Sequence, residues 1–395
     1  MKEDFMFSLP TRIEFGTKKI HSLIEYVREL GGSRIMILTD KGIGNAGIVK
    51  KVTDILDHGR FRYLIFDSIK ENPKDKDCMD AYRLAKKEKV DLLIGLGGGS
   101  SIDTAKAVGI LLEHGGSLQD WYGINTLQKS ITPLISIPTT SGTGSEITFF
   151  SVITDTNSKQ KMNILDKKMA ARIALLDPEL TFTLPAPITA STGMDALTHA
   201  IEAYTCNLAN PLTDAMALYA MELIVQNLPR AYRDGADEDA RKQMMLGSLL
   251  AGIAFGNSDV AGVHCMAEAL GGLYDTPHGV ANSMILPYVF EYNIPSNIPK
   301  HAEVAKRLGV QPAGKTTEEI AYEGVDKLYW LAETVNIPEM ADVDNIEPED
   351  FAYLAEGATR NVSASSNPRP LSVNEYMSLF HAAYKGKKGR ILWNK

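Results

Sequence analysis

The chain has 395 residues, of which 44% are hydrophobic and 23% are charged. This composition is that of a globular protein with one large or two ordinary domains, and it excludes extensive disorder. The formal net charge of −8 argues against a nucleic-acid partner, and the longest apolar runs are too short to predict a membrane span. Three widely spaced cysteines and a start without a secretory signal predict a reduced, cytoplasmic protein.

Short apolar runs alternate with amphipathic stretches in the first half of the chain. The apolar runs predict strands over 34–39, 62–66, 90–95 and 133–137. The stretches between them have helical spacing over 18–30, 48–58 and 78–88. This alternation predicts a parallel sheet covered by helices, and continuous apolar runs suit strands that are buried on both faces.

The pattern changes near Pro185-Ala186-Pro187, beyond which β-branched runs become rare. Helical spacing is found over 189–204, 211–226, 237–255, 260–273, 300–308 and 316–334. We therefore expect two domains, an α/β nucleotide-binding domain over 1–184 and an all-helical domain over 185–395.

A glycine turn joins the third predicted strand to the helix after it. Gly97, Gly98 and Gly99 would let a phosphate approach the backbone, and Ser100 or Ser101 could cap the following helix. No Gly-Lys-Ser/Thr follows, so the turn is not a P-loop. Taken alone, such a turn could also be purely structural.

A second glycine- and hydroxyl-rich loop, residues 138–146, follows the next predicted strand. Parallel sheets bind ligands at the carboxyl ends of their strands, so one dinucleotide explains both loops, although a solvated loop is the alternative. Asp40 ends the first predicted strand. A carboxylate there would accept hydrogen bonds from the ribose hydroxyls and repel the 2′-phosphate of NADP, which favours NAD, unless Asp40 is only a turn residue.

The helical half contains residues suited to bind a metal ion. Asp195 and His199 are four residues apart on one helical face, which also carries Glu202. His264 lies in an apolar helix and His278 in a turn between a proline and a glycine. Each histidine alone could be a buried core residue. Together the Asp-His-His-His set predicts a site for Fe(II) or Zn(II).

With these motifs in place, the chain resembles the iron-containing alcohol dehydrogenase family over essentially its whole length. The matching segments are GGGS at 97–100, PTTSGTGSE at 138–146, GMDALTHAIEAY at 193–204 and HGVAN at 278–282. The resemblance implies a Rossmann-like NAD-binding domain followed by an all-α metal-binding domain, the fold that this family shares with dehydroquinate synthase.

The resemblance also implies individual site residues. It implies that the metal ligands are Asp195, His199, His264 and His278. It implies cofactor contacts at Asp40, Asn72, Gly98, Gly99, Ser100, Thr139, Thr140, Thr143, Lys161 and Leu180.

One position departs from the family pattern. Many members carry a histidine four residues after the first histidine of the metal-binding helix, where this chain has Glu268. Family members often use that histidine to relay protons. Water, a ribose hydroxyl, His278 or Glu268 could carry the proton here, or Glu268 could join the coordination shell. The charge of Glu268 should disfavour anionic substrates.

The expected function is therefore metal-dependent, NAD-linked interconversion of a small primary alcohol or diol and its aldehyde by hydride transfer, in a homodimer or larger assembly. NADP is a less favoured cofactor, and Fe(II) is preferred over Zn(II). The alternatives are a dehydroquinate synthase-like lyase, a glycerol dehydrogenase-type polyol oxidation and a non-catalytic nucleotide-binding protein. The lyase would need a basic pocket for a phosphorylated acid, and no Lys/Arg cluster accompanies the histidine motifs.

Overall fold

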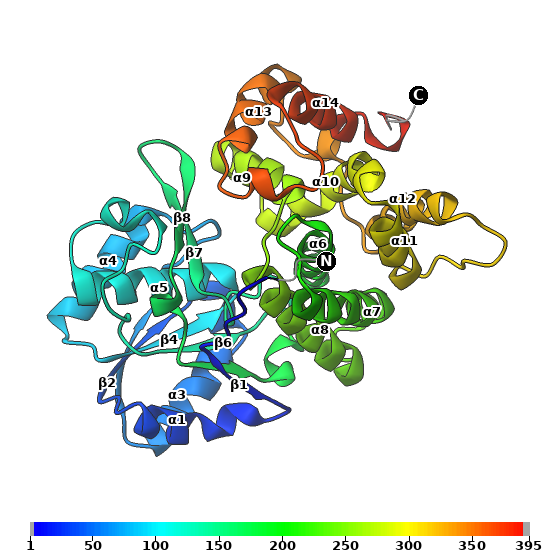
Figure 1. Cartoon of the computed structure of the whole chain (residues 1–395). Coiled ribbons are helices and arrows are strands. Elements are labelled where there is room, and N and C mark those ends of the chain that lie inside the picture. The colour runs from blue at the N-terminus through cyan, green and yellow to red at the C-terminus, as the bar shows by residue number, and fades with distance from the viewer. Residues whose placement is uncertain (1–3, 390–395) are drawn as a thin grey trace. The chain divides into compact units, whose positions relative to one another are not determined.

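A computed structural model describes residues 4–389 of the chain (Figure 1). The fold consists of two compact units, and the chain passes from one to the other between Leu184 and Pro185. The first unit comprises Ser8–Leu184, and the second comprises the chain from Pro185 onwards together with Asp4–Phe7.

The first unit is built on a six-stranded parallel sheet in the order β1-β9-β6-β4-β2-β3. Its strands are β1 (Arg12–Phe15), β2 (Arg34–Leu38), β3 (Arg62–Phe66), β4 (Leu92–Gly97), β6 (Leu134–Pro138) and β9 (Ile173–Leu176). The predicted parallel sheet is thereby confirmed. The sequence prediction missed β1 and β9, which have only four residues each, too few to show a clear period.

Helices cover both faces of this sheet. They are α1 (Leu23–Glu29), α2 (Lys41–Asn45), α3 (Ile48–His58), α4 (Asp75–Lys87) and α5 (Gly99–His114). In β2, Ile35 and Ile37 pack in one hydrophobic cluster with α1 and α3, whereas Met36 and Leu38 pack in the other cluster with α4 and α5. Successive side chains of a strand point to opposite faces, so an uninterrupted apolar run is what a sheet covered on both sides requires.

A small second sheet accompanies the large one. It contains β5 (Gly123–Ile124), β7 (Phe150–Asp155) and β8 (Gln160–Leu165), with β7 and β8 forming an antiparallel hairpin. The sequence prediction missed this hairpin, whose strands alternate buried and partly exposed residues weakly.

The strand order defines where the large sheet can bind a ligand. The chain runs outward from β2 to the edge strand β3 and then returns to the other side of β2 to form β4. The order therefore reverses between β2 and β4, and ligands of open α/β sheets bind at such a point beyond the carboxyl ends of the strands.

The second unit is helical throughout its described part. Its helices are α6 (Ala186–Thr205), α7 (Pro211–Arg233), α8 (Glu238–Gly256), α9 (Gly262–Tyr274), α10 (His278–Asn293), α11 (Ile298–Arg307), α12 (Thr317–Thr334), α13 (Phe351–Thr359) and α14 (Val373–Tyr384). Helix α6 packs against α7, α8 and α10, and α9 packs against α10 and α13. The predicted all-helical half is confirmed. None of the helices within residues 4–389 is long and apolar enough to cross a membrane.

Candidate active site

Two of the predicted metal ligands come from the buried helix α6. Asp195 is 1% exposed and His199 is 4% exposed, and they are one helical turn apart. Oδ2 of Asp195 lies 4.0 Å from Nδ1 of His199, whose ring stacks on Phe255 at a centroid distance of 4.1 Å. Packing against α7 and α8 thus fixes both side chains on one face of α6.

The other two predicted ligands come from α9 and α10. His264 lies in the first turn of α9 and is buried. The predicted turn at His278 is wrong, because His278 is the first residue of α10, after the N-cap Pro277, and its side chain is 32% exposed. Each of the four residues offers one ligand atom, and these atoms all lie within 4.8 Å of one another. The tertiary fold therefore brings together four residues that span more than eighty positions of sequence, and His278 is the member that faces outward.

The charges of this cluster suit a divalent cation. In the described part of the chain, the basic groups that approach Asp195 within ion-pair distance are the rings of His199, His264 and His278. A buried carboxylate without a permanent cation beside it is costly. Three imidazoles and one carboxylate are also the donors that borderline ions such as Fe(II) and Zn(II) prefer. The residues present therefore fit the metal that the family resemblance implies.

Glu202 lies behind His264 rather than among the four ligand atoms. Oε2 of Glu202 lies 2.6 Å from Nδ1 of His264, and both side chains are buried. Burial acts to lower the pKa of His264, but the hydrogen bond and the charge of Glu202 outweigh it, so the net pKa is raised. The sequence placed Glu202 on the face of Asp195 and His199 but could not show that it contacts another helix.

Asn282 is a further member of the cluster that sequence reasoning missed. Its Nδ2 lies 2.7 Å from Oδ1 of Asp195, 3.1 Å from Nε2 of His264 and 3.2 Å from Nε2 of His278. Atoms from three helices therefore lie within hydrogen-bond distance of one amide nitrogen, which donates to Asp195. The HGVAN segment contained the signal, since Asn282 follows His278 by four residues and so shares its helical face.

Glu268 lies one turn after His264 on α9 but does not belong to the four-residue cluster. Its Oε2 accepts a hydrogen bond of 2.7 Å from Nδ2 of Asn361. The side chain is only partly buried, whereas the neighbouring Cys265 is 1% exposed, and burial raises the pKa of its thiol. Glu268 thus lies outside the four-residue cluster, and its charge helps to raise the pKa of His264.

The two glycine- and hydroxyl-rich loops meet at the carboxyl edge of the sheet. A Cβ atom on Gly99 would lie 2.9 Å from Cγ2 of Thr143, and one on Gly98 would lie 3.5 Å from the side chain of Thr140. The backbone N–H of Thr139 donates to the carbonyl of Gly97 at 3.0 Å. A side chain at position 99 would therefore press against Thr143, and the loops after β4 and β6 lie in direct contact.

The expected serine cap on α5 is wrong. The helix begins at Gly99, so Ser100 and Ser101 lie in its first turn, and its N-cap residue is Gly98, which has no side chain to offer. A helix start without a side-chain cap leaves N–H groups that can donate hydrogen bonds to an anion.

Asp40 lies at the point where the strand order reverses. Its Oδ1 accepts a hydrogen bond of 3.0 Å from the N–H of Ile43 and so caps α2. Its Oδ2 is directed at the glycine turn, 3.5 Å from where a Cβ atom on Gly97 would lie. Oδ1 therefore caps α2, and Oδ2 faces the carboxyl edge of the sheet, where the dinucleotide is expected.

Three other expected cofactor contacts, Lys161, Asn72 and Leu180, lie outside these two loops. Nζ of Lys161, on the β7–β8 hairpin, lies 2.5 Å from Oδ1 of Asn72 in the loop before α4. These two residues are therefore joined although they are far apart in sequence. Leu180 is 2% exposed and packs in the hydrophobic cluster that includes Leu96 and Ile137, so its side chain supports the sheet edge from inside.

A buried polar cluster, unnoticed in the sequence, supports the second loop. Nζ of Lys106 is fully buried and donates to Ser145, Thr148 and the carbonyl of Phe150. Asp103 lies 3.7 Å from that ammonium group and receives a hydrogen bond from Ser145. Burial lowers the pKa of Lys106 and raises that of Asp103. The cluster ties helix α5 to the loop after β6.

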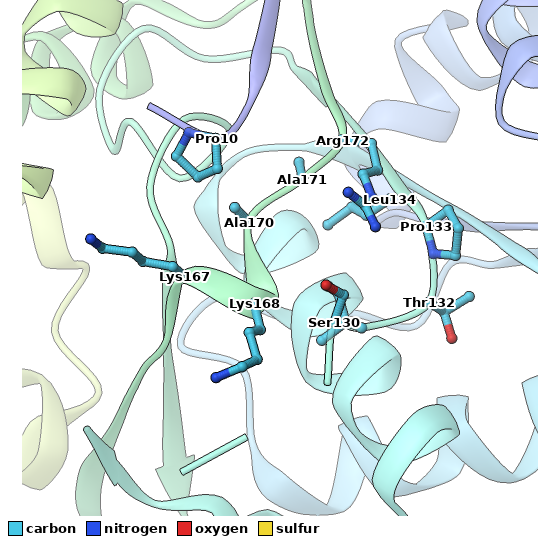
Figure 2. A pocket seen from close by; sticks show the side chains of 11 residues that line it. Pro10, Ser130, Thr132, Pro133, Leu134, Lys167, Lys168, Ala170, Ala171 and Arg172 are labelled. Carbon is cyan, nitrogen blue, oxygen red and sulfur yellow. The ribbon is translucent and has the colours of Figure 1, made fainter. Parts of the chain in front are cut away.

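A pocket of about 40 Å³ lies at the opposite, amino edge of the sheet (Figure 2). The pocket is lined by residues that come just before β1, β6 and β9 in the sequence, and Lys167, Lys168 and Arg172 are among them. A volume of this size holds only a few waters, since each needs roughly 10–15 Å³ and small-molecule sites measure roughly 300–1,000 Å³.

Comparison with known proteins identifies relatives of both units. Residues 10–178 match the family described as iron-containing alcohol dehydrogenase, and residues 189–384 match the C-terminal domain of the Fe-containing alcohol dehydrogenase family. The chain is 38% identical to 1,3-propanediol dehydrogenase of Citrobacter freundii, over 96% of this chain and 99% of that protein. It is 34% identical to NAD-dependent methanol dehydrogenase of Bacillus methanolicus, over 95% of this chain and 99% of that one.

A solved structure shows the same similarity in three dimensions. The crystal structure of a 1,3-propanediol oxidoreductase superimposes with a TM-score of 0.94 at 38% identity, covering 96% of this chain and 100% of that one.

Proposed function

The chain belongs to the iron-containing alcohol dehydrogenase family, and from that premise we propose that it is a metal-dependent, NAD-linked dehydrogenase of small primary alcohols or diols. The reaction converts the alcohol and NAD⁺ into the aldehyde, NADH and a proton, or runs in reverse. The observation that carries the proposal is the convergence of Asp195, His199, His264 and His278 within 4.8 Å in a chain with two matched family domains.

We assign those four residues as the metal ligands, with Fe(II) as the first choice and Zn(II) as the second. When bound, the cation supplies a Lewis acid that polarises the substrate oxygen, and NAD supplies the hydride acceptor. The buried residues Asp195, His199 and His264 hold one side of the site rigid. The partly exposed His278 marks the side from which a small alcohol would enter.

The dinucleotide is assigned to the carboxyl edge of the sheet. Its phosphates would bind the backbone at Gly98, Gly99 and Ser100, with Thr139, Thr140 and Thr143 lining the second loop. Asp40 directs one oxygen at this edge, and its charge would reject the 2′-phosphate of NADP. Lys161, Asn72 and Leu180 complete the proposed set.

The proton released from the alcohol is assigned to Glu268. Glu268 lies one helical turn after His264. Its Oε2 accepts a hydrogen bond from Asn361, which holds the carboxylate in position while it takes up the proton.

The test is metal reconstitution of the purified enzyme. The protein would be prepared anaerobically, stripped with a chelator and reloaded separately with Fe(II) or Zn(II). NADH absorbance would then be followed with methanol, ethanol, 1,3-propanediol, glycerol and the corresponding aldehydes. We expect turnover that requires metal and NAD and that is highest with one short alcohol or diol.

Two variants give the control. His264→Ala removes a proposed ligand and should abolish turnover and metal retention, whereas His301→Asn changes a buried histidine outside the cluster and should keep both. Full activity in the metal-free protein, or in His264→Ala, would disprove the metal-dependent mechanism.

A further inference from the structure

Glu202 makes three short hydrogen bonds to one neighbouring helix. Oε1 accepts from the N–H of Val263 at 2.7 Å, and Oε2 accepts from the N–H of Ala261 at 2.9 Å and lies 2.6 Å from Nδ1 of His264. The residue itself is on α6 and is 3% exposed. A buried carboxylate thus spans the gap between the helix of Asp195 and the helix of His264.

Two of these bonds replace a helix cap. The N-cap residue of α9, Ala261, offers no side-chain acceptor, so the first N–H groups of the helix need partners from elsewhere. A carboxylate at a helix start is also favoured by the positive end of the helix dipole. Glu202 therefore fixes the position of the first turn of α9, which contains His264.

The third bond decides which nitrogen of His264 carries hydrogen. Both carboxylate oxygens already accept backbone N–H groups, and an ionised carboxylate can only accept, so Nδ1 of His264 must be the donor. Nε2 then carries the lone pair. That nitrogen faces Nδ2 of Asn282 at 3.1 Å and Oδ1 of Asp195 at 4.0 Å, inside the cluster.

We infer that Glu202 is the positioning residue of the metal centre, which it serves by holding His264 as the Nδ1–H tautomer with Nε2 directed at the ion. This inference rests on the proposed function, because it assumes that the cluster binds a metal. Outer carboxylates that orient a ligating histidine typically change metal affinity by roughly 10–100-fold when they are removed.

The discriminating variant is Glu202→Gln. The side chain keeps its size, but its NH₂ group can no longer accept from Nδ1 and favours the opposite tautomer, with hydrogen on Nε2. We expect the metal dissociation constant, measured by chelator competition with Zn(II), to rise roughly 10–100-fold. In metal-free protein labelled with ¹⁵N-histidine, long-range NMR correlations should show His264 changing from the Nδ1–H to the Nε2–H form.

Glu202→Asp keeps a carboxylate on a shorter stem and should retain the Nδ1–H tautomer with a smaller loss of affinity. If the Gln variant does not fold, judged by circular dichroism, this variant decides: loss of the Nδ1–H tautomer would overturn the inference. Glu291→Gln is the matched control, because it neutralises another carboxyl group of 1% exposure in the same unit. It should leave both readouts unchanged.

A folded Glu202→Gln protein with unchanged metal affinity and unchanged His264 tautomer would overturn the inference. Failure of the proposed function would look different, because the wild-type chain would then bind no divalent metal at all. The tautomer comparison is made without metal, so it tests Glu202 whichever result the metal titration gives.

Discussion

The Cα atom of Gly279 packs directly against the backbone of Ser191, so that helices α10 and α6 touch one residue after His278. A Cβ atom at position 279 would overlap the carbonyl oxygen of Ser191 and lie 2.8 Å from its carbonyl carbon. These are backbone atoms of α6, so they cannot move aside by a change of side-chain rotamer. The glycine therefore permits the approach that puts Nε2 of His278 3.8 Å from Oδ1 of Asp195.

Gly279→Ala should accordingly weaken metal binding by forcing α10 away from α6. We expect at least a tenfold rise in the Zn(II) dissociation constant, and a loss of about 1–3 kcal/mol in the free energy of unfolding from overpacking. Gly357→Ala is the control, because its Cβ atom would meet only ordinary contact at 3.6 Å. Chelator competition and urea unfolding give the two readouts, and equal affinity in both variants would refute the argument.

Asp40→Asn should shift cofactor preference toward NADP. Asparagine caps a helix as well as aspartate does, so the bond to Ile43 is kept while the charge beside the glycine turn is removed. We expect the ratio of kcat/KM for NADP to that for NAD to rise roughly tenfold, which corresponds to about 1.4 kcal/mol. The exposed Asp54→Asn should leave the ratio unchanged. An unchanged ratio in Asp40→Asn would place the ribose elsewhere.

Glu268→Gln should relax discrimination against anionic aldehydes. A carboxylate near the centre repels a second negative charge, and its removal should favour an anionic over a neutral aldehyde by about 1 kcal/mol, or roughly fivefold in kcat/KM. In the Glu268→Gln variant, the new side-chain amide oxygen can still accept the hydrogen bond from Nδ2 of Asn361. Glu356→Gln, an exposed carboxylate on α13, serves as the control. A change in kcat/KM of equal size for both aldehydes would show that charge repulsion by Glu268 does not discriminate between them.

His301 should make stability fall in acid. It is 1% exposed on α11, its Nδ1 lies 2.8 Å from the carbonyl oxygen of Asn297, and burial lowers its pKa from 6.5 to about 4. Between these two pH values the unfolded chain binds a proton that the folded chain does not. The stability is therefore fully present above pH 6.5, and about 3 kcal/mol is lost as the pH falls to 4.

The measurement is the urea midpoint of unfolding across that pH range. His301→Leu removes the titrating group, so its stability should change less between pH 6.5 and 4 than that of the wild type. Identical slopes in the two proteins would show that His301 titrates normally in the folded chain.

Much of this protein could be predicted from local sequence. The apolar run of β2 predicts a strand that is buried on both faces, because Ile35 and Met36 must point to opposite sides and both be covered. The sequence likewise determined the glycine turn and loop at successive strand ends and the pairing of Asp195 with His199 on one helical face. All of these depend on the period of the chain or on the conformational demands of single residues.

Only the tertiary structure decided how distant residues combine. Glu202 and His199 share a helical face, yet the packing of both α6 and α9 against α10 leaves His199 in the four-residue cluster and places Glu202 beside Nδ1 of His264, outside that cluster. Lys106 and Asn282 acquire their partners from loops and helices far away in sequence. Local periodicity fixes the direction of a side chain from its own helix, but its neighbours depend on which other elements pack there, and that is settled by the whole core.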